Sequence, residues 1–190
     1  MTQPIRCFIA IEIPETIQNR LARIQETLRK QVQKASWVKP NNVHLTLKFL
    51  GDVDPDNLES IGEAIEGVAS RYRRFSLGIG GLGAFPNFAR PRVMWIGIKD
   101  GSGRVSSLAQ DINVALNECC GVSFDTKKFN PHLTIGRLKE RVDLRPYANQ
   151  YRQYDRIEGA EIKVDTISLI QSQLHPTGAI YSTVQSYLFS

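Results

Sequence analysis

The sequence predicts an α+β protein with mainly antiparallel sheet, built as two related lobes with outer helices and a central cleft in a single domain over residues 1–190. Segments with strand character outnumber long amphipathic segments, which favours this class. A strand–helix–strand unit that ends in His-Leu-Thr occurs twice, and its two histidines, His44 and His132, are 88 positions apart. Neither a linker nor a low-complexity tract separates the copies, so we expect them to share one domain.

The elements of the first half follow from apolar periodicity and from proline and glycine. Segment 5–13 is rich in β-branched and aromatic residues and ends before a proline, which is typical of a buried strand. Segment 14–33 carries apolar residues at spacings of three and four and predicts a helix that begins at that proline. Segment 36–51 returns to strand character and ends at a glycine, and the helical spacing returns over 58–69.

The second half repeats this plan. Strand composition predicts two strands around a loop that contains two prolines, and an amphipathic helix follows and ends at a glycine. A second His-Leu-Thr strand comes next, and a hairpin around His-Pro-Thr-Gly closes the chain. The expected elements cover residues 75–85, 90–99, 102–121, 132–138, 161–174 and 179–189.

The charge balance and the cysteines restrict the class of protein. An excess of 24 Lys and Arg over 19 Asp and Glu gives a net charge of +5, which suits an anionic partner such as nucleic acid. The three cysteines show neither zinc-type spacing nor a disulfide framework, which indicates a reducing compartment. The apolar N-terminal stretch is interrupted by Glu12 and is too short for a signal sequence or a membrane span. We therefore expect a cytoplasmic protein that does not enter a membrane.

The two His-x-Thr strands are the strongest functional signal. Successive side chains of a strand point to opposite faces, so His44 and Thr46 share one face, and His132 and Thr134 do the same in the second copy. The apolar residues between them can anchor each strand to its core. If the two lobes pack with these faces opposed, two imidazoles and two hydroxyls line one cleft.

That set of groups is suited to acid–base catalysis on a phosphodiester. An imidazole exists in either protonation state near neutral pH, so one histidine can donate a proton while the other accepts one. The threonine hydroxyls can donate hydrogen bonds to nonbridging phosphate oxygens. Strict alternation places Lys48 on the face of His44, where it would add positive charge. The chemistry expected is attack by water without a metal ion.

Other uses of these residues are less well supported by the sequence. Zinc normally has three or four protein ligands, and neither a His-Glu-x-x-His motif nor paired cysteines of zinc type occur. A phosphate-binding Gly-Lys-Ser/Thr loop and a Gly-x-Ser-x-Gly motif are also missing. His175 begins a third His-x-Thr, but the neighbouring proline and glycine predict a turn, where alternation does not apply.

At these residues the chain resembles the 2H phosphoesterase superfamily, which is defined by two His-x-Thr/Ser motifs. Within it, the chain looks like the RNA 2′,3′-cyclic phosphodiesterase family (ThpR/LigT), also called 2′-5′ RNA ligase. The resemblance covers almost the whole chain. It rests on "RCFIAIEIP", "HLTLKFLG", "FPNFARPRVMWIGI", "PHLTIGRL" and "SLIQSQLHPTGAIYSTV".

The resemblance implies a bilobal LigT-like fold and hydrolysis of a terminal 2′,3′-cyclic phosphate on RNA to a 2′-phosphate, with no cofactor and no metal. In that scheme His44 donates a proton to the departing 3′ oxygen and His132 accepts one from the attacking water. Thr46 and Thr134 hold the phosphate. The residues themselves do not decide which histidine is the acid, so this assignment comes from the family alone.

The resemblance also supplies one further candidate for substrate binding. The family places an arginine five residues after the second histidine, and Arg137 matches it. Alternation would turn Arg137 away from His132, but a β-bulge at Gly136 would restore its direction. For the RNA chain, our preferred contacts are Arg92 for phosphate and Trp95 for stacking.

Three alternative functions stay open on the sequence. The same cleft working in reverse could join tRNA halves through a 2′-5′ linkage. The protein could be an RNA-end-binding module with little catalysis, or it could act on small cyclic nucleotides. The expected partner is RNA with a 2′,3′-cyclic phosphate end, including tRNA fragments, bound by a monomer.

Overall fold

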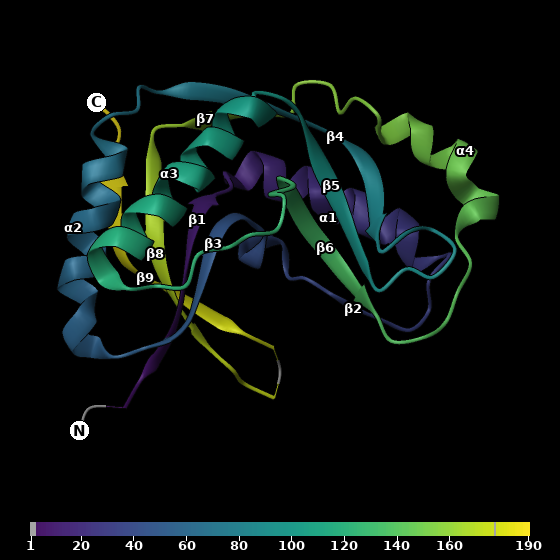
Figure 1. Ribbon diagram of the computed structural model, residues 1–190. Helices are drawn as coiled ribbons and strands as arrows, with labels where there is room; N and C mark the ends of the chain where they lie inside the picture. The colour runs from purple at the N-terminus through teal and green to yellow at the C-terminus, as the bar shows by residue number, and fades with distance from the viewer. Residues whose placement is uncertain (1–2, 177) are drawn as a thin grey trace.

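Two antiparallel sheets form the centre of the protein, and each contains one of the His-x-Thr strands (Figure 1). The computed structural model describes residues 3–176 and 178–190. The first sheet has the strand order β3-β1-β8-β9, and the second has the order β2-β6-β5-β4-β7. The strands are β1 (Ile5–Glu12), β2 (Ala35–Trp37), β3 (His44–Val53), β4 (Phe75–Phe85), β5 (Val93–Asp100), β6 (His132–Leu138), β7 (Glu161–Val164), β8 (Thr166–Gln173) and β9 (Ile180–Leu188).

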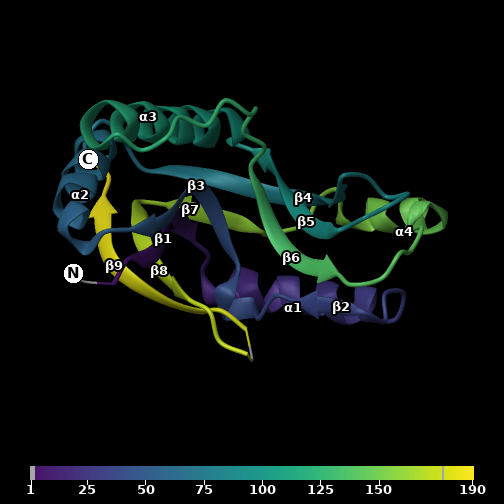
Figure 2. The ribbon, with the colours of Figure 1, turned by 60° about the horizontal axis from the view of Figure 1, so that its bottom comes forward.

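The helices pack crosswise on the two sheets. They are α1 (Glu15–Arg29), α2 (Leu58–Ala69), α3 (Ser102–Cys120) and the short α4 (Ala148–Tyr151). Helix α3 lies beside α2 and packs on β3 of the first sheet, whereas α1 packs against β6 of the second sheet (Figure 1, Figure 2). The helix of each repeated unit therefore covers the sheet of the other unit, and one continuous core joins the lobes.

Two buried polar side chains fix this crosswise packing. Gln25 of α1 donates from Nε2 to the carbonyl oxygens of Val38 (2.8 Å) and Ile135 (2.7 Å). Asn113 of α3, which lies 88 positions after Gln25, accepts a hydrogen bond from the ammonium of Lys48 in β3 (2.8 Å). Buried polar groups need such partners. Each helix is thus held in register against the His-x-Thr strand of the other lobe.

Most elements lie where the sequence predicts them, and two predicted strands need correction. The helix 58–69 and the strands 75–85 and 132–138 are confirmed at both ends. Segment 36–51 is not one strand, because it contains the end of β2 in the second sheet, a 3-10 turn, and β3 in the first sheet. Segment 161–174 is likewise divided into β7 and β8. The alternation of apolar and polar residues predicts only the local conformation of a strand. Which sheet the strand joins depends on its pairing partners, which lie far away in the chain.

The short helix α4 had no counterpart in the sequence analysis. The predicted closing hairpin is confirmed, since β8 and β9 pair as antiparallel neighbours. Among the residues described, none of the helices combines the length and the apolar character needed to cross a membrane.

Candidate active site

Strand β6 contains a β-bulge directly after its threonine. Thr134 and Gly136 pair with consecutive residues of β5, which leaves Ile135 as the extra residue. An extra residue shifts the alternation of side chains by one position. Arg137 therefore lies on the same face as His132, as a bulge in this strand was expected to allow. The bulge lies at Ile135, one residue before the glycine.

Strand β3 contains the same bulge at the corresponding position. Thr46 and Lys48 pair with consecutive residues of β1, and Leu47 is the extra residue. The expectation that Lys48 shares the face of His44 is wrong, because the bulge turns Lys48 to the opposite face. Phe49 occupies the face of His44 instead. It is the counterpart of the arginine in β6, since both stand five residues after their histidine.

Lys48 connects β3 with α3 and the loop that follows α3. Its side chain is buried, and its ammonium donates to Asn113 Oδ1 (2.8 Å) and to the carbonyl oxygen of Ser123 (2.7 Å). It also lies 2.9 Å from a carboxylate oxygen of Asp125. An ammonium has three donors, and three protein oxygens surround this one. These bonds give Lys48 a structural role. Because Lys48 also forms part of the wall of the cavity that contains His44, its predicted role in substrate binding stays a prediction.

One cavity of about 1080 Å³ brings the predicted catalytic residues together. His44, Thr46, His132, Thr134 and Arg137 all line it. Aromatic side chains and the basic pair at positions 127–128 form other parts of the wall. Within the described chain, no three side chains of the His, Cys, Asp or Glu type gather where they could hold a metal ion.

The ring of His44 is held in one orientation. Its Nδ1 lies 2.9 Å from the carbonyl oxygen of Asn42, and because a carbonyl only accepts, Nδ1 carries the hydrogen and Nε2 stays available for proton transfer. Phe8 stacks on the ring at 4.5 Å between centroids, and Tyr181 meets it edge-on at 5.2 Å. Burial lowers the pKa of His44, while the bond to Asn42 and the negative charge of Glu12 act in the opposite direction.

The ring of His132 is held in an equivalent way. Its Nδ1 donates to the carbonyl oxygen of Asn130 at 2.6 Å, which again leaves Nε2 available. Phe85 meets the ring edge-on at 5.0 Å, and Trp95 lies at 6.0 Å. Burial lowers the pKa of His132, the bond to Asn130 opposes this, and the positive charge of Arg137 lowers the pKa further. The two imidazoles thus share a tautomer and differ in the charge beside them.

Comparison with known proteins places this arrangement in a family. The chain matches the family described as LigT like Phosphoesterase over residues 11–95 and again over residues 96–181. The chain belongs to the LigT-like phosphoesterase family. The double match agrees with the repeated unit in the sequence, and it confirms the resemblance found from the His-x-Thr motifs.

Relatives of known name cover almost the whole chain. An Aquifex aeolicus protein named RNA 2′,3′-cyclic phosphodiesterase is 32% identical over 184 residues, which is 96% of each chain. A Thermotoga maritima protein of the same name is 34% identical over 185 residues, covering 97% of this chain and 96% of its own. A crystal structure of a Thermus thermophilus protein superposes with a TM-score of 0.81 at 25% identity, covering 97% of this chain and 98% of its own. The predicted LigT-like fold is confirmed.

Arg92 and Trp95, two of the expected RNA contacts, do not line the cavity that contains the predicted catalytic residues, which we call the catalytic cavity. Trp95 is not among the residues that line the cavity, because its ring packs behind His132 and over Gly83, where an added Cβ would collide with it. Trp95 therefore packs near the imidazole, and its expected role as a stacking surface for RNA stays a prediction. Arg92 lines a second cavity at the ends of β5 and β6. His175 is exposed in the turn between β8 and β9, as predicted.

The sequence analysis missed several neighbours of the two imidazoles in this family member. Glu12 faces the same side of the sheet as His44, as the register of β1 with β3 shows, and a polar residue at the end of an apolar strand was its signal. Asn42 and Asn130 extend the repeat to Asn-x-His-Leu-Thr. Tyr181 gave no local signal, because it belongs to a distant hairpin strand.

Proposed function

We propose that this protein hydrolyses the 2′,3′-cyclic phosphate at the end of an RNA to a 2′-phosphate by paired-histidine catalysis that needs no metal ion. The observation that carries the proposal is one cavity lined by two imidazoles with free Nε2 atoms, two threonines and an arginine. The names of the relatives support the choice of substrate, because they are called RNA 2′,3′-cyclic phosphodiesterases.

The reaction is an attack of water on phosphorus with loss of the 3′ oxygen. Nε2 of His132 takes a proton from the water as its oxygen bonds to phosphorus. The bond between phosphorus and the 3′ oxygen breaks, and this oxygen takes a proton from Nε2 of His44. Thr46 and Thr134 donate hydrogen bonds to the nonbridging oxygens, and the guanidinium of Arg137 offsets the negative charge that grows on them.

The charges beside the rings favour this assignment of acid and base. Glu12 lies opposite His44 in the β1–β3 ladder, and its negative charge favours the imidazolium that a general acid must be. Arg137 shares the face of His132, and its positive charge favours the neutral imidazole that a general base must be. Burial lowers the pKa of both rings, and an anionic phosphodiester in the cavity then favours protonation of the acid.

The test is product analysis with purified protein in EDTA. An RNA that ends in a 2′,3′-cyclic phosphate is expected to give only the 2′-phosphate, which is distinguished from the 3′-phosphate by its chromatographic mobility beside both standards. His175→Ala, a substitution at an exposed histidine outside the cavity, is the control and should act at the wild-type rate. Formation of the 3′-phosphate, loss of turnover in EDTA, or no turnover would each contradict the proposal.

A further inference from the structure

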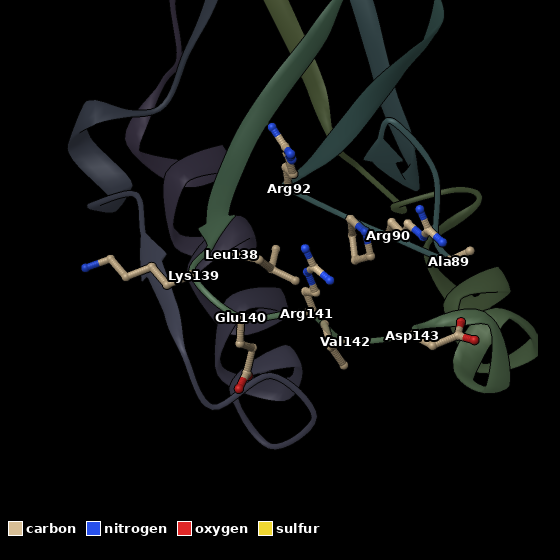
Figure 3. A pocket seen from close by; sticks show the side chains of 10 residues that line it. Ala89, Arg90, Arg92, Leu138, Lys139, Glu140, Arg141, Val142 and Asp143 are labelled. Carbon is tan, nitrogen blue, oxygen red and sulfur yellow. The ribbon is translucent and has the colours of Figure 1, made fainter.

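A second cavity of about 600 Å³ lies at the far end of β5 and β6. It is formed by two loops, Ala89–Arg92 and Leu138–Asp143, and we call it the basic groove. In Figure 3 Arg141 lies between the two loops, Arg92 extends upward along the strands and Arg90 extends to the other side, while Lys139 and Glu140 extend away from the loops. The groove therefore presents guanidinium groups from both loops to one bound molecule.

The two carboxylates of the basic groove already have partners. Glu140 accepts a hydrogen bond from the backbone N–H of Lys34 at 2.9 Å. Asp143 accepts two hydrogen bonds at 3.0 Å from Nε of Arg145, and a third at 2.6 Å from its terminal nitrogen. The charge of Asp143 is therefore offset by Arg145, whereas Glu140 keeps its negative charge and forms no ion pair with an arginine of the groove among the described residues.

The three arginines have no such partner. Over residues 3–176 and 178–190, no carboxylate forms an ion pair with Arg90, Arg92 or Arg141. All three are exposed, so their charges cost little to maintain in water and stay available for an anion. The loops that carry them are held by backbone hydrogen bonds, from Leu144 to the carbonyl of Phe88 (2.8 Å) among others. The groove is thus shaped before any ligand binds.

The basic groove and the catalytic cavity are lined by consecutive residues of β6. Arg137 lines the cavity, and Leu138, the next residue, lines the groove. The backbone N–H of Leu138 donates to the carbonyl of Arg92 at 2.9 Å, which joins the two loops. At about 3.3 Å per residue along β6, the groove begins about 20 Å from His132. A chain with its terminal phosphate at the imidazoles must extend by several nucleotides to reach it.

We propose that the basic groove binds the phosphate backbone of RNA upstream of the cyclic end, so that the preferred substrate is an oligonucleotide and not a cyclic mononucleotide. This inference rests on the proposed function of the catalytic cavity. Single-stranded RNA is bound without base preference by positive grooves that follow its backbone. The lining of this groove contains no aromatic ring on which a base could stack, so recognition here is by phosphate charge.

The test compares two substrates and two double variants. Arg90→Gln with Arg141→Gln removes two charges from the groove, and Arg73→Gln with Arg74→Gln removes two exposed charges elsewhere. kcat/KM is measured for an RNA of about ten nucleotides with a cyclic end, a length within the range that such grooves bind, and for a cyclic mononucleotide. On the RNA at 0.15 M salt, kcat/KM of the groove variant should be about tenfold lower than that of the wild type. The wild type and both double variants should hydrolyse the cyclic mononucleotide with the same kcat/KM.

The salt dependence gives a second readout. Each lost contact with a single-stranded phosphate should make the slope of log kcat/KM against log salt shallower by about 0.7, so the groove variant should differ from wild type by about 1.4. Equal losses on both substrates, or equal losses in both double variants, would overturn the inference. If the wild type hydrolyses neither substrate, the proposed function fails. In that case the affinity for the same RNA tests the groove, and equal affinity of the wild type and the groove variant would overturn the inference that the groove binds RNA.

Discussion

In the first lobe His44 lies opposite Glu12 of the neighbouring strand, whereas in the second lobe His132 lies opposite Gly97. The backbones of the two strands are otherwise alike, with the same bulge after the threonine and the same Nδ1 bond to the carbonyl two residues earlier. The repeated backbone gives both imidazoles equivalent geometry. The residues around the repeat supply a difference in charge, which is the difference that the proposed acid and base require.

A second difference stands five residues after each histidine. Arg137 in β6 and Phe49 in β3 occupy corresponding positions and line the same cavity. Phe49 is 65% exposed, which is unusual for a large apolar side chain. The arginine can bind the phosphate from one side, and the phenyl ring offers a surface on which the terminal base can stack. If the proposed function holds, we expect the two lobes to divide recognition of one nucleotide between charge and apolar contact.

The largest effect is expected when either imidazole is removed. His44→Ala and His132→Ala should each lower kcat by about 10²–10⁴-fold on a cyclic-ended RNA, because each ring transfers a proton in the same transition state. The double variant should be little slower than the slower single variant, since groups that act as a unit are not additive. Single-turnover rates measure this directly. A rate near that of wild type in one single variant would show that one imidazole suffices.

Smaller effects, on different kinetic constants, are expected from substitution of Arg137 and of Phe49. Arg137→Gln should lower kcat by about 10²-fold, because it removes a charged donor from the phosphate in the transition state. Phe49→Ala should instead raise KM by about tenfold with little change in kcat, since stacking of one base contributes about 1–3 kcal/mol. Steady-state kinetics with a cyclic-ended RNA separate the two constants. A matching loss of kcat in both variants would mean that the lobes do not divide the work in this way.

The limits of sequence reasoning are clearest in these same strands. The amphipathic helices and the His-x-Thr faces follow from local periodicity, and both were predicted. Lys48 was assigned to the wrong face because a bulge breaks alternation without leaving a mark such as glycine or proline at Leu47. The division of segments 36–51 and 161–174 between two sheets depends on pairing partners far away in the chain. Glu12 became significant only when the register placed it opposite His44.

The smallest effect is expected when the negative charge of Glu12, which lies opposite His44, is removed. Glu12→Gln removes a negative charge that favours the imidazolium, so the pKa of His44 should fall while that of His132 stays in place. If His44 is the acid, its loss of a proton forms the alkaline limb of the pH profile of kcat/KM, and this limb should move to lower pH. Titration of the ring protons by NMR, with His175 as internal control, assigns the shift to one ring. Movement of the acidic limb alone would exchange the roles of the two histidines, because the protonation that stops catalysis would then be that of His44.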